Sequence, residues 1–143
     1  EMLRSLVGSE MCIRDSFTVD DLKYLHRGGR VSKTAAIAGS ILGIKPLLHV
    51  DNEGHLIPVG KIRGRKQSIE KLVDMMCERM GNWDNSTVAV CHGDCLSDAE
   101  YAADLMRKKL GKKTTVHICY TGAVIGSHSG PGTLALFFMG DQR

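Results

Sequence analysis

The spacing of apolar residues predicts a chain that alternates between strands and helices in its second half. A stripe at positions 69, 72, 73, 76 and 80 indicates a helix over Ser68–Met80. Ser97 and Glu100 form a capping-box pattern ahead of a second helix, which Gly111 ends. A short helix, Gly122–Ile125, is expected before the last strand. Apolar and β-branched runs predict three buried strands, over Ser86–Cys91, Thr114–Tyr120 and Leu134–Met139. This order of elements predicts an α/β (α+β) fold, with a mixed β-sheet covered by helices.

In the first half of the chain, glycines and capping residues mark the predicted ends of helices. Thr18 is placed to cap a helix that Gly28 stops. Ser32 is a second N-cap, ahead of a helix over Lys33–Leu42 with small residues along one side. That side predicts either tight packing against a neighbouring element or the wall of a groove for a slender apolar ligand. Turn-forming residues at 51–54 separate two strands and so predict a hairpin, over Lys45–Val50 and His55–Ile62.

Residues 1–16 fit poorly with the rest of the sequence. Their apolar spacing is weak, Gly8 interrupts it, and the segment looks like translated adapter sequence from assembled environmental reads. We therefore expect residues 1–16 to be a non-native leader, which is left out of the fold prediction, and residues 17–143 to form the domain. This expectation implies that the natural protein begins further upstream and that the chain is a fragment.

Composition sets broad limits on the function. With 143 residues, of which 43% are hydrophobic, the chain can build one ordinary domain with an apolar core. A net charge of +3 is too mild to indicate nucleic-acid binding by itself. No apolar run approaches the ~20 residues of a membrane span. The five cysteines are odd in number and irregularly spaced, so reduced thiols in a cytoplasmic protein are the simplest expectation.

A glycine-rich stretch with one histidine, Gly126–Gly132, is the main candidate for a binding site. Its glycines and Pro131 predict a tight turn between two apolar segments. Backbone N–H groups that point the same way in such a turn form a concave cluster of donors, or nest, which suits a carboxylate or phosphate oxygen. His128, Ser129 and Gly130 are therefore candidate anion-binding residues. The alternative is a simple turn whose histidine is only hydrogen-bonded to backbone.

A second candidate is the basic run Lys61–Lys66, which has four cations in six residues. Arg63 and Arg65 alternate, so an extended segment would project both of them toward the same anion. A solvated surface is the ordinary alternative. The run also leaves open a nucleic-acid or protein interaction module, and its binding to RNA or DNA would then fall steeply with added salt.

The residues favour no enzyme class. Ser127 and Ser129 flank His128, but adjacent residues rarely form a nucleophile–base hydrogen bond, and a Gly-x-Ser-x-Gly elbow after a strand is absent. A small serine hydrolase is therefore a minor alternative. The histidines and nearby aspartates lack a recognisable metal-ligand spacing, and the glycine patterns match neither a Walker loop nor a dinucleotide fingerprint. We expect no catalytic residue, no metal and no cofactor.

Four ordered motifs resemble the DegV family. They are a stretch that ends in Leu25-His-Arg-Gly-Gly-Arg30, then Ile44-Lys-Pro-Leu-Leu48, then Gly60-Lys-Ile-Arg-Gly-Arg-Lys66, and finally the glycine-rich histidine loop. The resemblance covers essentially residues 17–143. It implies a two-lobed protein that holds a long-chain fatty acid between its lobes and is the non-catalytic binding subunit of a bacterial fatty acid kinase. It also implies that this chain is the second lobe, without the N-terminal lobe.

The resemblance assigns roles to residues as well. The family's carboxylate-contacting histidine falls on His128. The cations that face the kinase or its phosphate fall on Arg63 and Arg65, with Arg27 and Arg30 as second choices. The expected partners are a long-chain fatty acid, the missing N-terminal lobe and an ATP-dependent fatty acid kinase subunit, and nucleic acid is not expected. The walls of the acyl-chain pocket are expected at Ala36, Ile37, Ser40, Ile41 and Leu48.

Overall fold

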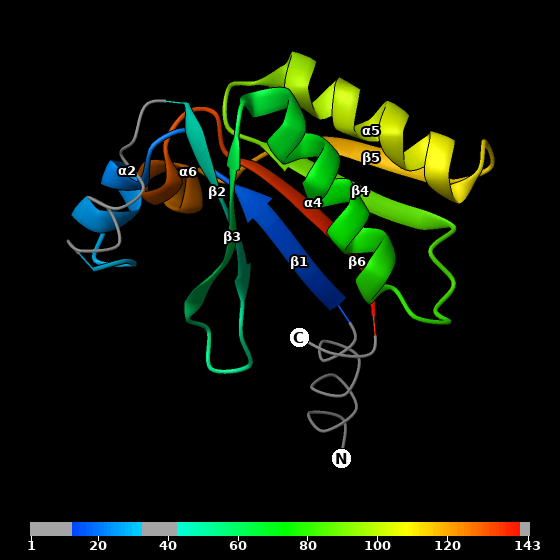
Figure 1. The fold of residues 1–143 in the computed structure, drawn as a ribbon, viewed down its shortest axis with the longest axis horizontal. Coiled ribbons are helices and arrows are strands. Elements are labelled where there is room, and N and C mark those ends of the chain that lie inside the picture. Colours follow the sequence, from blue (N-terminus) through cyan, green and yellow to red (C-terminus); the bar gives the residue numbers. More distant parts are fainter. Residues whose placement is uncertain (1–12, 33–42, 141–143) are drawn as a thin grey trace.

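The computed structural model describes residues 13–32 and 43–140, which form a six-stranded sheet with helices packed on it (Figure 1). The strand order is β3-β2-β1-β6-β4-β5. The strands are β1 (Ile13–Thr18), β2 (Ile44–Val50), β3 (Leu56–Arg63), β4 (Thr87–His92), β5 (Thr115–Tyr120) and β6 (Leu134–Met139). The helices are α2 (Leu22–Arg27), α4 (Arg65–Arg79), α5 (Leu96–Leu110) and α6 (Ala123–Ser129). The expected α/β architecture is confirmed.

The sheet combines antiparallel and parallel neighbours, as predicted for a mixed sheet. β4 and β5 are parallel and are joined by α5, because a parallel pair requires a crossover connection. The other neighbouring strands are antiparallel. The last strand, predicted over Leu134–Met139, is confirmed residue for residue. It lies in the middle of the sheet, between β1 and β4.

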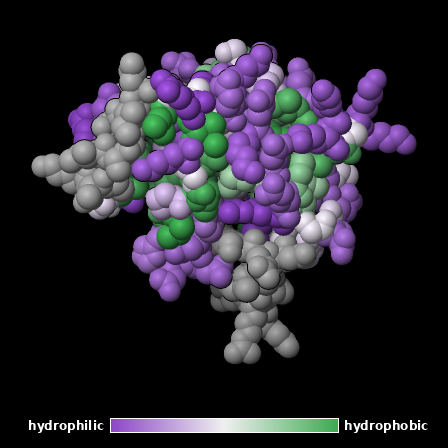
Figure 2. Space-filling view, viewed as in Figure 1, coloured by the Kyte–Doolittle hydropathy of each residue, from purple (hydrophilic) through white to green (hydrophobic). Residues whose placement is uncertain are grey.

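Helices α4 and α5 cover one face of the sheet and bury the main core (Figure 1). Leu72 and Met76 of α4 belong to the same fully buried cluster as Leu136 of β6. Because successive strand residues point to opposite faces, Ala135 and Phe137 lie on the other face. In the same view, hydrophilic side chains cover the outer surfaces of the two helices (Figure 2). The face of β1 and β6 turned away from α4 and α5 is therefore the one that a site can use.

Residues 13–16 belong to the fold, although they fall within the segment expected to be a leader. They are part of β1, which pairs with β6 from Ile13, opposite Met139, to Thr18, opposite Leu134. Ser16 is fully buried. The remainder of the expected leader, residues 1–12, lies outside the described residues, and its non-native origin stays a prediction.

The first two described helices begin at residues other than the predicted ones. Thr18 ends β1, and the N-cap of α2 is Asp21, whose carboxylate accepts a hydrogen bond from the backbone N of Lys23 at 2.8 Å. α4 begins at Arg65 rather than at Ser68. In both cases the chain is still extended, and paired in the sheet, close to the residue where the helix begins, so strand pairing decides the boundary.

The later helices also depart from their predicted ends. α5 has Cys95 at its N-cap with no side-chain hydrogen bond to the cap, so the capping box predicted for Ser97 and Glu100 is wrong. α6 continues to Ser129 instead of ending at Ile125. The hairpin predicted around residues 51–54 is confirmed in β2 and β3, whereas the helix predicted over residues 33–42 lies outside the described residues. Within the described parts of the chain, no helix has the length and apolarity needed to cross a membrane.

Candidate functional site

The candidate site lies where the pairing between strands β1 and β2 ends. β1 pairs with β6 along its whole length, but with β2 only at Phe17 and Thr18. Beyond this point the β2–β3 hairpin diverges from β1 (Figure 1). The carboxylate of Asp15 bridges the gap, because it accepts a hydrogen bond from the backbone N of Val50 at 3.1 Å. A wedge is therefore open between the hairpin and the rest of the sheet.

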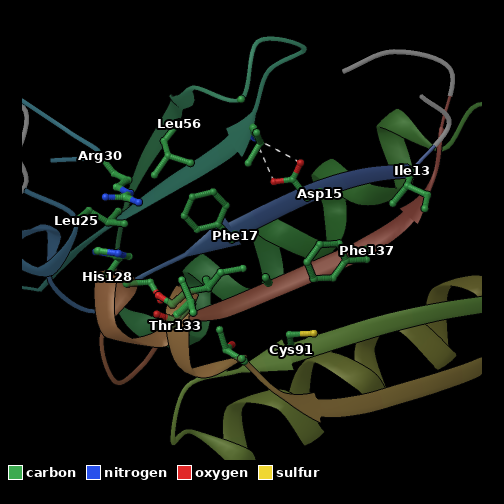
Figure 3. A pocket seen from close by; sticks show the side chains of 18 of the residues that line it. Ile13, Asp15, Phe17, Leu25, Arg30, Leu56, Cys91, His128, Thr133 and Phe137 are labelled. Carbon is green, nitrogen blue, oxygen red and sulfur yellow. Dashed lines mark hydrogen bonds between the residues drawn. The ribbon is translucent and has the colours of Figure 1, made fainter. Parts of the chain in front are cut away.

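A cavity of about 470 Å³ occupies this wedge (Figure 3). Much of its wall is apolar, with Phe17 from β1 and Ala135 and Phe137 from β6. At one end, where α2 and α6 meet, the wall becomes polar and contains Arg30 and His128. The volume lies in the range of roughly 300–1,000 Å³ that is common for small-molecule sites. The cavity thus joins an apolar surface to a cation and an imidazole.

His128 is held by a close contact between α6 and the end of α2. A Cβ atom on Gly28 would lie 2.4 Å from Nδ1 of His128, so the imidazole packs directly on the glycine backbone. A matching contact is made by Gly130, where a Cβ atom would lie 2.4 Å from the ring of Tyr24. Among the described residues, the imidazole has no hydrogen-bond partner. The imidazole therefore lines the cavity without being committed to a hydrogen bond within the described part of the chain.

Arg30 reaches the cavity because a glycine ends α2 in a left-handed turn. Gly29 has a φ of 73°, a conformation that glycine adopts without a steric penalty. Its N–H donates to the carbonyl oxygen of His26 at 2.9 Å, and the N–H of Arg30 donates to that of Leu25 at 2.8 Å. This pair of bonds is a Schellman motif. Nη1 of Arg30 also donates to the carbonyl oxygen of Gly28, which keeps the guanidinium near the backbone on which the imidazole packs.

The stretch around His128 does not present a cluster of free donors, so the predicted backbone nest is wrong. Residues 126–129 continue α6. The N–H groups of Gly130 and Gly132 donate to carbonyl oxygens of the fold, at 2.8 and 2.7 Å. Ser129 is buried, and its hydroxyl donates to a carbonyl oxygen one turn back in α6, at 2.9 Å. Of the three predicted anion-binding residues, His128 alone offers an unused polar side chain to the cavity.

The same geometry removes the support for a serine hydrolase. The hydroxyl of Ser127 donates to the carbonyl oxygen of Val124 at 2.7 Å, and that of Ser129 is likewise used within α6. Neither serine is hydrogen-bonded to His128. Within the described residues, no group of three or more histidines, cysteines or acidic residues is placed to hold a metal ion. The cavity offers apolar contact, a guanidinium group and an imidazole.

Comparisons with known proteins identify the family. A sequence profile of the DegV family, described as a family of uncharacterised proteins, matches residues 10–141. The chain belongs to the DegV family. It is 47% identical over 127 residues to a DegV domain-containing protein of Clostridium perfringens, and this match covers 89% of the chain and 43% of that relative.

Solved structures of DegV proteins have the same fold. The structure of DegV from Bacillus subtilis, a fatty acid binding protein, matches with a TM-score of 0.73 and 33% identity, over 98% of this chain and 49% of that one. The fatty acid kinase B3 protein of Streptococcus pneumoniae, loaded with linoleic acid, matches with a TM-score of 0.85 over 97% of this chain and 48% of that one. Its identity is 16%, so this likeness shows the fold alone. The chain spans about half the length of each of these two proteins.

Of the five residues predicted for the wall of the acyl-chain pocket, Leu48 alone lies among the described residues. Leu48 is fully buried in a small cluster with Phe17 and Leu25, and it supports the cavity wall without lining it. Its assignment to the wall of the acyl-chain pocket stays a prediction. The other four residues lie outside the described residues and stay predictions: Ala36, Ile37, Ser40 and Ile41.

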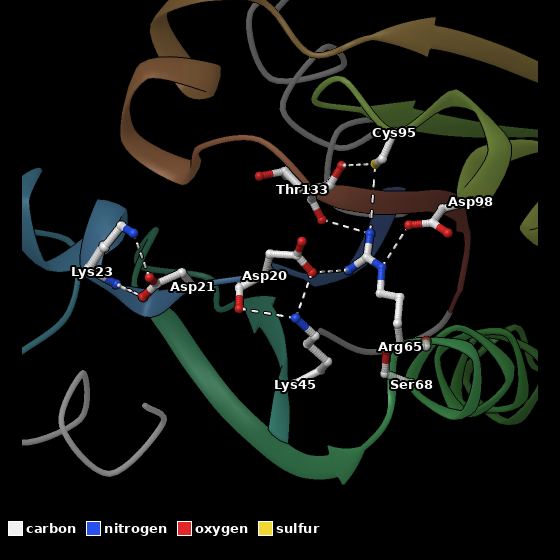
Figure 4. Close-up of polar contacts among 10 residues, drawn as sticks. Asp20, Asp21, Lys23, Lys45, Arg65, Ser68, Cys95, Asp98 and Thr133 are labelled. Atoms are coloured by element: carbon white, nitrogen blue, oxygen red, sulfur yellow. Dashed lines mark hydrogen bonds and ion pairs between the residues drawn. The ribbon is translucent and has the colours of Figure 1, made fainter. Parts of the chain in front are cut away.

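Arg65 makes several polar contacts inside the DegV fold, and its predicted role as a kinase-facing or phosphate-facing cation stays a prediction. Its side chain is only 19% exposed. Nε pairs with Asp98 at 2.8 Å, and Nη2 donates to the carbonyl oxygen of Gly132 at 2.7 Å (Figure 4). Nη1 lies 3.6 Å from a carboxylate oxygen of Asp20, which Lys45 also contacts, at 2.8 Å. Arg65 thereby ties together the start of α5, the loop before β6 and the loop after β1.

Arg63 and Arg65 do not project together because the backbone turns sharply between them. Arg63 ends β3, the next residue has a φ of 93°, and Arg65 begins α4. Lys66 lies over the ring of Tyr101, with its Nζ 5.0 Å from the centroid. The basic run is therefore not a continuous row of cations, which weakens the case for a nucleic-acid interface. Arg63 and Arg27 are exposed, and their kinase-facing role stays a prediction.

The sequence alone does not reveal the cavity wall. Phe17 and Phe137 face the cavity from neighbouring strands, and Arg30, predicted only as a kinase-facing alternative, lines the same cavity as His128. One signal was present, since all six residues of the last strand are apolar. A strand of this kind has apolar surroundings on both faces, and α4 and α5 supply only one of them. The apolar surroundings on the second face exist because β2 diverges from β1, and no local sequence pattern indicates this divergence.

Replacing Gly28 by alanine is expected to destabilise the protein through its contact with His128. Gly28 has a φ of −78°, which alanine adopts readily, so the penalty is steric and comes from the imidazole. We expect Gly28→Ala to lower the free energy of unfolding by about 1–3 kcal/mol, as overpacking does, in urea denaturation. Gly29→Ala is the matched control. Its added Cβ meets nothing within 4 Å, and only the φ of 73° penalises it, by about 1–2 kcal/mol.

A double variant separates the two effects. Adding His128→Ala to Gly28→Ala should restore most of the lost stability, because the imidazole no longer occupies the position of the new methyl group. Adding His128→Ala to Gly29→Ala should restore none of it. A loss of stability in Gly28→Ala that persists without the imidazole would show that the two residues are not in contact.

Proposed function

We propose that this chain is one lobe of a fatty-acid-binding protein, and that its cavity holds a long-chain fatty acid with the carboxylate between Arg30 and His128. The observation that carries the proposal is the cavity of about 470 Å³, whose apolar wall ends at these two side chains. The relative from B. subtilis, which is 33% identical and has the same fold, is named a fatty acid binding protein.

Simple energetics support a fatty acid as the ligand. Transfer of a methylene group from water to an apolar surface contributes about 0.8 kcal/mol, so a tail of ~16 carbons provides about 10 kcal/mol. The carboxylate must then be paired, because burying it without a partner costs far more than a hydrogen bond returns. Arg30 carries a permanent positive charge, and His128 can donate from a ring nitrogen. Apolar contact would supply affinity, and these two residues would select an acid.

A further lobe would complete the site. Ile13 and Ile125 line the cavity, yet they are 44% and 64% exposed. A covering lobe would bury these apolar side chains and close the cavity around the acyl chain. The C. perfringens relative is long enough for such a lobe, since the match covers only 43% of it. We infer that the complete protein binds its ligand between this lobe and the first one.

The finer part of the proposal is that the bound acid is presented to an ATP-dependent kinase partner. The protein would contribute orientation, by holding a carboxylate oxygen where it can attack a γ-phosphate to form an acyl phosphate. Arg63 and Arg27 are the exposed predicted cations that remain for contact with that partner. A fatty acid kinase B3 protein is among the proteins of this fold. Because the partner uses ATP, we place the complete protein in the cytoplasm, as a non-catalytic subunit.

A chimera tests the binding proposal. The first half of the B. subtilis protein is joined to residues 13–140 of this chain, so that the cavity is covered by a lobe of the same family. We expect the chimera to co-purify from bacterial cells with a long-chain fatty acid, detected by native mass spectrometry. The intact B. subtilis protein, purified in parallel, serves as the positive control.

Two lysine variants show whether the lipid occupies the cavity. Phe137→Lys places a charge in the apolar wall and should abolish co-purification of the fatty acid. Val59→Lys makes the same kind of change at an exposed residue of β3 that does not line the cavity, and should leave the bound lipid in place. An empty, folded chimera beside a loaded B. subtilis protein would refute the proposal.

A further inference from the structure

Two cysteines face each other across the parallel strands β4 and β5. Cys91 and Cys119 are directly opposite in the register of these strands. Their Sγ atoms are 2.9 Å apart, so the two thiols are in direct contact. Neighbouring strands are about 4.8 Å apart, and this spacing lies inside the Cα separation of roughly 4.4–6.8 Å that a disulfide bond spans. The backbone therefore already holds the two residues at bonding range.

The surroundings of the two thiols differ. Cys119 is exposed on the edge strand of the sheet, whereas Cys91 is half-buried and lines the cavity. Burial, and secondly the neighbouring Cys119, raise the pKa of the Cys91 thiol to about 12, so Cys91 stays protonated at neutral pH. An oxidant in solution therefore meets Cys119 first, and Cys91 lies behind it as the second thiol.

We propose that Cys91 and Cys119 form a reversible dithiol–disulfide site, which peroxides oxidise and small thiols reduce. The site follows from the register of β4 and β5, so it does not depend on the fatty-acid proposal. Because Cys119 is exposed, both the oxidant and the reducing thiol can reach the pair. The bond would link the edge strand β5 covalently to the interior of the sheet, beside the cavity.

The oxidation balances with hydrogen peroxide as the oxidant. The sulfur of Cys119 loses its proton and attacks one peroxide oxygen, the O–O bond breaks, and the leaving hydroxide takes up that proton to become water. The sulfur of Cys91 then attacks the sulfenic acid on Cys119, the S–O bond breaks, and the hydroxyl leaves as a second water with the proton of Cys91. Two thiols give up two electrons and two hydrogens, and one peroxide becomes two waters.

The other described cysteines serve as internal controls. Cys95 donates to the carbonyl oxygen of Thr133 at 3.3 Å and lies 3.6 Å from a guanidinium nitrogen of Arg65. Cys77 belongs to α4, on the helix-covered side of the sheet. Neither thiol has a described cysteine as a contact partner. The geometry thus predicts one intramolecular disulfide within the described residues, between positions 91 and 119.

Peptide mapping of the 143-residue chain tests this proposal. The native chain is treated with hydrogen peroxide, its remaining thiols are alkylated, and it is cleaved on the N-terminal side of aspartate. This cleavage separates Cys91, in peptide 84–93, from Cys95, in peptide 94–97. We expect peptide 84–93 to be recovered linked to the peptide that contains Cys119, from monomeric protein. Treatment with a small thiol should restore both free peptides.

Variants and denaturant supply the contrast. Cys91→Ser or Cys119→Ser should eliminate the linked species, whereas Cys77→Ser and Cys95→Ser should leave its yield unchanged. Peroxide treatment in concentrated urea should give mixed pairings, because the register of the strands is lost. The proposal is overturned if native protein leaves Cys91 and Cys119 alkylated separately. A link from Cys119 to Cys95, or one found only between two chains, would overturn it as well.

The disulfide should also be visible in thermal unfolding. Cross-linking residues 91 and 119 restricts the unfolded chain, so the oxidised protein should melt at a higher temperature than the reduced protein. The same peroxide treatment should not raise the melting temperature of Cys119→Ser. An equal rise in both proteins would mean that the stabilisation comes from oxidation elsewhere.

Discussion

His128→Ala should weaken the binding of a long-chain fatty acid by roughly 10- to 100-fold, while the matching fatty alcohol should lose less than about threefold. A hydrogen bond to a charged group contributes about 1.5–3 kcal/mol, and about 1.4 kcal/mol is a tenfold change in affinity. The imidazole lines the polar end of the cavity and has no described hydrogen-bond partner of its own, so its loss removes a ligand contact and leaves the fold in place. Competition against a fluorescent fatty acid, in the chimera with the B. subtilis lobe, measures both affinities.

Two neighbouring changes make this test specific. Ser127→Ala, one residue away, removes a hydroxyl that is already bonded to a carbonyl oxygen of α6, and should alter neither affinity. Arg30→Gln should likewise weaken binding of the acid more than of the alcohol, because it removes the guanidinium charge at the same end of the cavity. Equal weakening of acid and alcohol in His128→Ala would mean that the imidazole is only part of the wall.

The second large effect concerns stability, and we expect Arg65→Met to lower the free energy of unfolding by about 2 kcal/mol. Methionine keeps the apolar stem but removes the donors that reach Asp98 and the carbonyl oxygen of Gly132. Charged hydrogen bonds in such positions contribute about 1.5–3 kcal/mol each, and partial exposure of the carboxylates reduces the total. Urea denaturation measures the change. Arg65→Lys should recover only part of it, because one ammonium group cannot reproduce the fork of the guanidinium.

Arg63 is the matched control for Arg65. It lies two residues away and is exposed, so Arg63→Ala should change the free energy of unfolding by less than about 0.5 kcal/mol. In the complete protein with its kinase, the same variant should bind fatty acid normally and form acyl phosphate more slowly. If Arg65→Met proves as stable as Arg63→Ala, the ion pairs around Arg65 contribute nothing to the fold.

Local chemistry determined most of the secondary structure. The hairpin follows from its turn, where the carboxylate of Asp51 accepts hydrogen bonds from the backbone N of Glu53 and of His55, at 2.9 and 2.8 Å. The apolar stripe of α4 and the apolar run of β6 were equally predictable, because burial of one or both faces of an element determines the spacing of its apolar residues. The starts of the helices were harder to predict from the sequence. Ser97 and Glu100, for example, fit a capping box that the structure does not contain.

The sequence by itself determined the family and the mixed α/β fold, and it predicted His128 as a binding residue. The tertiary structure alone decided what surrounds that histidine. The steric fit of Gly28 against the imidazole, the place of Arg30 on the same cavity and the apolar wall from β1 and β6 join segments that lie far apart in the chain. Such contacts depend on strand register and close packing, which leave no local pattern. The same reason explains why Arg65, which the sequence predicts to be a surface cation, forms ion pairs inside the fold.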